Sequence, residues 1–102
     1  MAIIKKYLKT KPVCKTTFEL PKDAVSGDPA VFLVGDFNAW SKTATPMKRL
    51  KNGQYKATVD LEAGRSYRFR YLIGEDQWEN DWEADRYEPS PYTGADNSVV
   101  QV

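Results

Sequence analysis

The chain has no histidine and only one cysteine among its 102 residues. Without histidine the Cys/His zinc patterns are excluded, and the commonest general base of enzymes is missing. Cys14 has no second thiol to pair with, so an internal disulfide is excluded, and its place in an alternating segment predicts a core thiol. Catalysis would have to rest on carboxylates alone.

Long apolar runs are also missing. The longest, residues 30–34, is far shorter than the roughly 20 residues that a membrane-spanning helix needs, so we expect no membrane partner. The N-terminus has neither a signal-peptide core nor a cleavage site, which predicts a cytoplasmic location. A second core would leave each half of a 102-residue chain too small to be stable, so one domain is expected.

The net charge of +1 conceals an uneven distribution. Residues 1–70 carry fourteen Lys and Arg against six Asp and Glu (+8), whereas residues 71–102 carry one against eight (−7). Either the two ends pair, within one fold or in a homo-oligomer, or the basic part meets an anion such as nucleic acid. The basic residues are scattered singly rather than clustered with aromatics, which favours pairing and no nucleic-acid partner. We therefore expect the basic N-terminus to lie near segment 77–88.

Several short segments alternate apolar and polar residues with the period of a β-strand. The clearest are 14–20, 30–34, 55–61, 67–73 and 98–102, with a short strand around Trp78. Segment 30–34 is apolar throughout, which is typical of a central strand. A turn at 62–64 predicts that 55–61 and 67–73 form a hairpin.

The rest of the chain gives weaker signals. Ile3, Ile4, Tyr7 and Leu8 would line one face of two helical turns at most. Residues 80–97 look irregular, and loops of this length in a compact domain are often binding elements. About seven short strands separated by turns predict an all-β fold, an antiparallel β-sandwich.

An acidic run offers the only candidates for catalysis or metal binding. It consists of Glu75, Asp76, Glu79, Asp81, Glu83 and Asp85. Two of these carboxylates could act as a glycosidase pair, but a solvated turn and loop is the favoured interpretation. Segment 76–88 also lacks the glycine that a calcium loop requires at its sixth position. We therefore predict no enzyme activity, no catalytic residue, no metal and no cofactor.

Three tryptophans, Trp40, Trp78 and Trp82, fall in polar, turn-like contexts. A tryptophan in such a place is either a lid on the core or an exposed platform. An exposed ring with polar neighbours suits a sugar, which has an apolar face and a rim of hydroxyls, although nucleic-acid bases also stack on aromatics. Arg68, on the outward face of its strand, could supply hydrogen-bond donors.

An ordered set of motifs runs through most of the chain. The motifs are Phe32 to Trp40 (FLVGDFNAW), Gly53, Leu61 to Gly64 (LEAG), Tyr67 to Tyr71 (YRFRY), Gln77-Trp78 with Asp81, and Gly94 to Val102 (GADNSVVQV). This set resembles the family 48 carbohydrate-binding modules. It is similar to the glycogen-binding domain of AMP-activated kinase β subunits and to the early-set domains of isoamylases and glycogen-branching enzymes. The resemblance covers residues 13–102 and implies an immunoglobulin-like β-sandwich, with residues 1–12 as a basic N-terminal extension.

The resemblance also implies a binding site. Trp40 and Trp78 match the tryptophans that stack on glucose rings, while Arg68, where the kinase domains have lysine, and Asn97 match the hydrogen-bonding residues. Asn38, Trp82 and Tyr92 are possible additional carbohydrate contacts. Segment 82–92 has no counterpart that aligns with the kinase domains, which leaves the chain-length preference open.

The function that this resemblance implies is non-catalytic binding of α-1,4-linked glucan such as glycogen, starch or maltooligosaccharides. The chain could thereby bring a glycogen-metabolising enzyme to its substrate. The alternative is a protein-interaction or scaffold domain with a vestigial sugar site, using the same face or an open edge strand.

Overall fold

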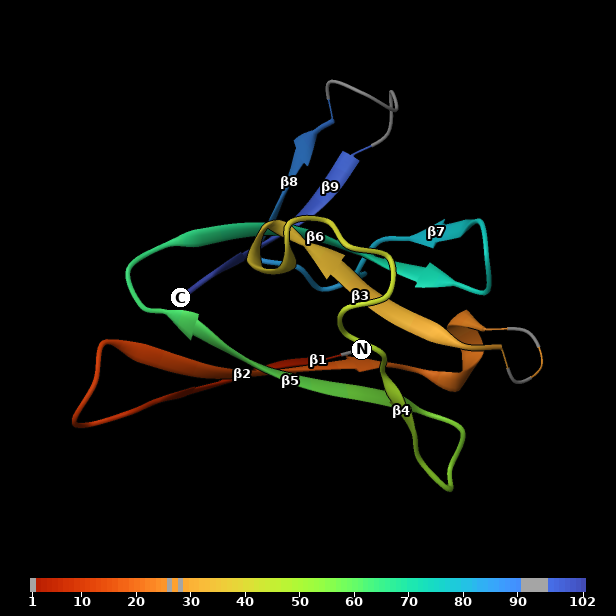
Figure 1. Cartoon of the computed structure of the whole chain (residues 1–102), viewed down its shortest axis with the longest axis horizontal. Helices are drawn as coiled ribbons and strands as arrows, with labels where there is room; N and C mark the ends of the chain where they lie inside the picture. The colour runs from red at the N-terminus through yellow and green to blue at the C-terminus, as the bar shows by residue number, and fades with distance from the viewer. Residues whose placement is uncertain (1, 26, 28, 91–95) are drawn as a thin grey trace.

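The computed structural model describes residues 2–25, 27, 29–90 and 96–102, which form two antiparallel sheets packed face to face (Figure 1). Sheet A has the strand order β1-β2-β5-β4, and sheet B the order β3-β6-β9-β8 with β7 also paired to β6. The strands are β1 (Ala2–Tyr7), β2 (Val13–Leu20), β3 (Val31–Gly35), β4 (Lys48–Arg49), β5 (Tyr55–Glu62), β6 (Ser66–Ile73), β7 (Gln77–Glu79), β8 (Arg86–Pro89) and β9 (Asp96–Gln101).

The predicted immunoglobulin-like β-sandwich is confirmed, with nine strands in the described part rather than about seven. Helical structure in this part is limited to two 3-10 turns, η1 (Lys22–Ala24) and η2 (Asp36–Asn38). Neither turn has the length or apolar character that crossing a membrane would require.

The core lies between the two sheets and follows the alternation of the sequence. In β2 the side chains of Cys14, Thr16, Phe18 and Leu20 are fully buried, as predicted. The ring of Phe18 meets that of Phe69 from sheet B edge to face, with the centroids 5.0 Å apart. This aromatic contact packs the two sheets against each other and stabilises the sandwich.

The predicted hairpin of β5 and β6 is wrong, because the two strands belong to different sheets. β5 pairs with β2 and β4, whereas β6 pairs with β3, β7 and β9. In the connection between them, the Ala63 N–H donates to the Pro12 carbonyl (2.9 Å) and the Gly64 N–H donates to the Val102 carbonyl (2.8 Å). The turn is thus bonded to other parts of the chain and passes from one layer to the other.

β3 lies at the edge of sheet B and not at its centre, where the apolar run had placed it. β6 occupies the central place. On the open side of β3, the Leu33 N–H donates to the Thr45 carbonyl (2.9 Å) and the Met47 N–H donates to the Val31 carbonyl (2.8 Å). The loop that follows β3 therefore covers this edge, which explains how an edge strand can be apolar throughout.

The N-terminal segment is a strand, so the helical interpretation of its apolar residues is wrong. Every residue of β1 pairs with β2, from Ala2 opposite Glu19 to Tyr7 opposite Cys14. Residues 2–7 were expected within a basic extension, but they form one of the two edge strands of sheet A.

Segment 80–97 is less irregular than predicted, because it contains β8, which pairs with β9. Before β8, the chain passes along the core-facing side of β9. There Asp81 is fully buried, with its carboxylate accepting from the Tyr71 hydroxyl (2.7 Å) and its N–H donating to Ser98 Oγ (2.9 Å). This crossing closes one side of the sandwich.

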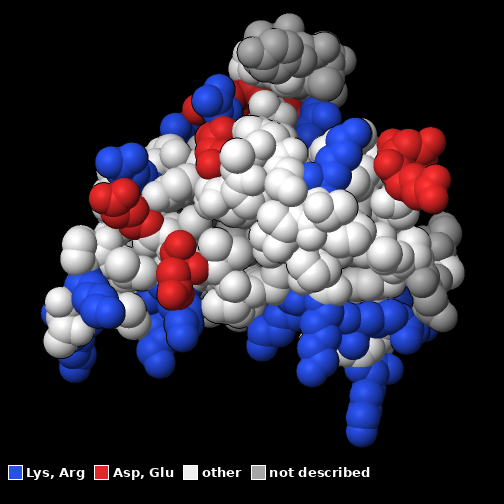
Figure 2. Space-filling model, in the orientation of Figure 1, with Lys and Arg blue, Asp and Glu red and all other residues white. Residues whose placement is uncertain are grey.

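The basic side chains are concentrated on one of the two sheets. Lysine and arginine side chains project along the side formed by sheet A, at the bottom of Figure 2. At the side closed by segment 80–85, Lys5 Nζ lies 2.7 Å from Asp85 Oδ2, and this ion pair joins β1 to the start of β8. The predicted proximity of the basic N-terminus and segment 77–88 is confirmed at this pair, within one chain.

Lys5→Ala should lower the free energy of unfolding by about 0.5–1 kcal/mol at low salt and by less at high salt, because the pair is partly exposed. Burial alone would raise the pKa of Asp85, but the Gln101 N–H and Lys5 hold it below its ordinary value. This stabilisation should therefore be lost as the pH falls below about 4. Lys6→Ala is the matched control, since Lys6 lies opposite Lys15. Chemical denaturation at two ionic strengths checks the prediction, which is wrong if the two variants behave alike.

Candidate functional site

The turn after β3 is fixed by a glycine and a phenylalanine. At Gly35 a Cβ would lie 2.5 Å from the Arg68 carbonyl oxygen and 2.8 Å from Phe69 Cβ, so only glycine lets the turn lie directly against β6. Phe37 then packs its ring against Phe18, with the centroids 5.9 Å apart. These two contacts anchor η2 to both the sheet and the core.

Asn38 holds the same turn through its side-chain amide. Its Oδ1 accepts from the Gly35 N–H (3.1 Å), while its Nδ2 donates to the Leu33 carbonyl (2.9 Å) and to Thr45 Oγ1 (3.1 Å). Both ends of the amide are used within the loop. The contacts give Asn38 a structural role, and we do not include it in the proposed sugar site.

Trp40 stands at a sharp change of chain direction. Ala39 and Trp40 have φ angles of 56° and 58°, in the left-handed region that non-glycine residues rarely adopt. Such strain costs on the order of 1–3 kcal/mol and tends to occur at binding and active sites. The strain makes Trp40 a candidate for function on its own, apart from any resemblance.

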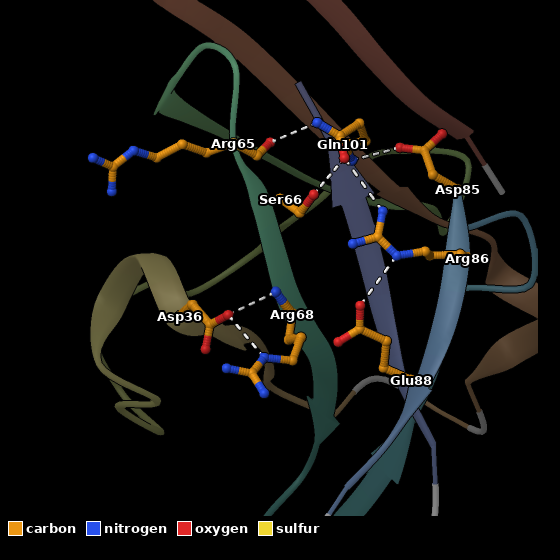
Figure 3. Close-up of polar contacts among 8 residues, drawn as sticks. All are labelled: Asp36, Arg65, Ser66, Arg68, Asp85, Arg86, Glu88 and Gln101. Atoms are coloured by element: carbon orange, nitrogen blue, oxygen red, sulfur yellow. Dashed lines mark hydrogen bonds and ion pairs between the residues drawn. The ribbon is translucent and has the colours of Figure 1, made fainter.

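Asp36 connects Trp40 to Arg68. The Trp40 indole N–H donates to Asp36 Oδ1 (2.8 Å), while the backbone N–H and the Nε of Arg68 donate to Asp36 Oδ2 at 2.9 and 3.2 Å. Figure 3 shows the carboxylate of Asp36 facing Arg68 across the gap between η2 and β6. One carboxylate thus fixes both an aromatic ring and a guanidinium group.

Partial burial alone would raise the pKa of Asp36, but the donors around it have the larger combined effect. The backbone N–H of Arg68, the indole of Trp40 and the guanidinium of Arg68 together hold the pKa below its ordinary value of 3.8. Asp36 is therefore ionised at neutral pH, and its charge is balanced by Arg68.

Arg68 lies on the outer face of sheet B, opposite Val99 of β9. Its Nε is taken by Asp36, and among the described residues no acceptor is hydrogen-bonded to its two terminal amino groups. A guanidinium held at one edge in this way presents its remaining donors in a fixed direction.

Trp78 lies on the same outer face, on β7 and opposite Leu72 of β6. Its side chain is 37% exposed, and Lys42 Nζ lies 6.0 Å from the ring centroid, at the limit of a cation–π contact. Lys42 belongs to the loop that carries Trp40, so this loop reaches from one tryptophan to the other.

Asn97 lies in β9, opposite Glu88 of β8, and is largely buried. Beside it, Arg70 donates from Nε (3.1 Å) and Nη2 (2.6 Å) to the carbonyl of Asp96. This contact fixes the start of β9. The outer face of sheet B therefore presents two aromatic rings and a guanidinium group, a set of groups suited to a sugar, while the Asn97 amide lies beneath this face at 7% exposure.

The sequence was also compared with known families. Residues 29–92 match the model of carbohydrate-binding module 48, the isoamylase N-terminal domain. The chain belongs to this family. No curated protein matches the chain.

The family 48 match assigns the chain to a class of carbohydrate-binding modules that are generally non-catalytic. It includes Trp40, Arg68 and Trp78, whereas Asn97 lies beyond it. The roles of these four residues in sugar binding remain predictions, which the arrangement on one face supports.

A further predicted contact, Trp82, is not part of this face. Trp82 follows the buried Asp81, on a segment that lies on the core-facing side of β9 and hence across the sheet from Arg68. Its side chain is 54% exposed. Tyr92 lies outside the described residues.

Two of the carboxylates of this family 48 module that could have formed a glycosidase pair have structural partners. Asp81 is buried against Tyr71, and Asp85 pairs with Lys5. Burial raises the pKa of Asp81, and the hydrogen bonds from Tyr71 and Glu83 offset this only in part. Within the described ranges, no group of three or more Cys, Asp or Glu residues could hold a metal ion.

Asp36 is a site residue that was not predicted from the sequence. The available signal was its spacing, four residues before Trp40 in a tight turn. Spacing alone does not show that the same carboxylate also meets Arg68, which lies 32 residues further along the chain.

Proposed function

We propose that this chain binds α-1,4-linked glucan, such as glycogen, starch or maltooligosaccharides, on the outer face of sheet B, and that it is not an enzyme. The observation that carries the proposal is the contact of Asp36 with both Trp40 and Arg68. It holds an aromatic ring and a hydrogen-bond donor in place before the ligand arrives, and such preorganisation lowers the ordering cost of binding.

In this proposal Trp40 and Trp78 stack on sugar rings, while Arg68 and Asn97 hydrogen-bond the hydroxyl groups. The rings come from two separate elements, a turn and a short strand, which suits a curved α-1,4 chain better than a flat β-1,4 chain. A partner enzyme joined or bound to the module would thereby be brought to glycogen.

Native electrophoresis in gels that contain glycogen tests the proposal. We expect glycogen and amylopectin to retard the chain and carboxymethylcellulose to leave its mobility unchanged. Two stacked rings and a few hydrogen bonds predict weak binding, with a Kd for short maltooligosaccharides from roughly tens of micromolar to millimolar. Equal retardation by both polymers would contradict the proposal, and no retardation by either would favour the scaffold alternative.

A further inference from the structure

The outer face of sheet B continues past Arg68 and Asn97 onto β8. In the register of β8 with β9, Arg86 lies opposite Val99 and Glu88 lies opposite Asn97. Because residues directly opposite each other in an antiparallel pair share a face, Arg86 and Glu88 lie on the same face as the proposed sugar site. Figure 3 shows Arg68, Arg86 and Glu88 along this part of the sheet.

Arg86 and Glu88 are held in a hydrogen-bond network. Arg86 donates from Nε to Glu88 Oε2 (3.1 Å) and from Nη1 to Gln101 Oε1 (3.2 Å). Gln101 in turn accepts from the Ser66 hydroxyl and donates to the Arg65 carbonyl (3.4 Å). Both side chains remain accessible, at 48% for Arg86 and 38% for Glu88.

This network leaves donor and acceptor groups side by side on the surface. Among the described residues, none is hydrogen-bonded to Nη2 of Arg86 or to Oε1 of Glu88. A guanidinium beside a carboxylate can donate to one hydroxyl and accept from the next. The two charges cancel, so the pair suits a neutral, polyhydroxylated chain better than an anion.

We propose that Arg86 and Glu88, with Gln101 holding Arg86 in place, form a further glucan subsite on β8, which contacts sugar residues beyond those held by Trp40, Trp78 and Arg68. The inference rests on the proposed function. Adjacent strands lie about 4.8 Å apart, so Arg86 lies roughly 10 Å from Arg68 across the sheet. A trisaccharide with two of its rings stacked on Trp40 and Trp78 has a single ring left, which is too short to span this distance, whereas a heptasaccharide has enough rings left to do so.

The consequence is a dependence of affinity on chain length. In the unaltered chain, maltoheptaose should bind more tightly than maltotriose. Arg86→Ala should weaken maltoheptaose binding about tenfold, as expected for the loss of hydrogen bonds to a charged group, and should leave maltotriose binding within about twofold. Glu88→Ala should have the same selective effect.

Arg65→Ala is the matched control. Arg65 is also an exposed arginine and comes directly before β6, but its side chain pairs with Glu62 at the end of β5. It should change the binding of neither oligosaccharide. Melting temperatures of all variants should stay close to that of the unaltered chain, because exposed ion pairs contribute only about 0–1 kcal/mol.

Isothermal titration calorimetry with both oligosaccharides separates the possible outcomes. A selective loss for maltoheptaose in Arg86→Ala supports the subsite. Equal affinity of the variant and the unaltered chain for maltoheptaose, or an equal loss for both ligands, overturns it while leaving the proposed function intact. If the unaltered chain binds neither oligosaccharide, the proposed function fails and the subsite fails with it.

Discussion

Trp78→Ala and Trp40→Ala should each abolish the retardation of this chain by glycogen. The expected binding free energy for a short oligosaccharide is only about 4–6 kcal/mol, and it rests on two stacked rings with a few hydrogen bonds. Losing one ring removes a stacking contact that contributes on the order of 1 kcal/mol or more to the binding free energy. The sugar is then no longer held in position for the remaining ring and the hydrogen-bonding residues. Binding should fall below detection in gels and in calorimetry.

Both variants should keep the fold, because neither ring belongs to the core. Trp78 is 37% exposed, and far-UV circular dichroism and the melting temperature should stay close to those of the unaltered chain. At position 40 a second variant sharpens the test. The positive φ there favours glycine, so Trp40→Gly should be at least as stable as Trp40→Ala and equally unable to bind.

Trp82→Ala is the matched tryptophan control. Trp82 is the more exposed ring, at 54% against 37% for Trp78, yet its segment lies across the sheet from Arg68. It should bind glycogen as the unaltered chain does. If Trp40→Ala and Trp78→Ala destabilise the fold and still bind, or if only Trp82→Ala loses binding, the proposed site is on the wrong face.

The faces of the strands could be predicted from the sequence because the alternation has a period of two. Cys14 and Phe18 fall on the core side, and Arg68 falls on the outer side, whichever strands lie next to them. The partners of each strand could not be predicted in the same way. Alternation in β5 and β6 is compatible with a hairpin and equally with two layers. The pairing of β5 with β2 and of β6 with β3 and β9 distinguishes them.

The same limit applies to the site. The motif that ends in Trp40 shows which residues stand near the tryptophan in the chain, and the contacts of Gly35, Phe37 and Asn38 explain why the motif has those residues. The pairing of Asp36 with Arg68 depends on β3 lying beside β6, which is a property of the folded sheet. The pairing of Asp36 with Arg68 therefore cannot be predicted from local patterns in the sequence.

Asp36 should therefore control both stability and binding, and its titration should show it. Its pKa is below the ordinary 3.8, so the folded state favours the carboxylate. A carboxyl group with a lowered pKa contributes stability that is fully present above its unfolded value, about 3.9, and that is lost as the pH falls through the folded value. The free energy of unfolding and the affinity for glucan should both be independent of pH near pH 7. The contribution of Asp36 to each should disappear below about pH 4.

Asp36→Asn isolates this contribution, because it keeps the shape of the side chain and removes the charge. The amide can accept on one side only, so Arg68 loses its ion pair and either Arg68 or Trp40 loses a hydrogen bond. Asp36 is partly exposed, and we expect a loss of about 1 kcal/mol in unfolding free energy at pH 7. In this variant Trp40 and Arg68 are held less firmly, so the ligand must order them on binding. We expect this cost to weaken maltoheptaose binding about tenfold.

The pH profile separates a positioning role from a merely structural one. The affinities of the unaltered chain and of Asp36→Asn, measured by titration calorimetry from pH 7 to pH 3, should differ about tenfold at neutral pH and converge below pH 4. The emission of Trp40, read in a Trp78→Phe, Trp82→Phe background, should shift over the same range only when Asp36 is present. A constant difference in affinity across the range, or an emission that does not respond to pH, would show that Asp36 does not hold Trp40 and Arg68 through its charge.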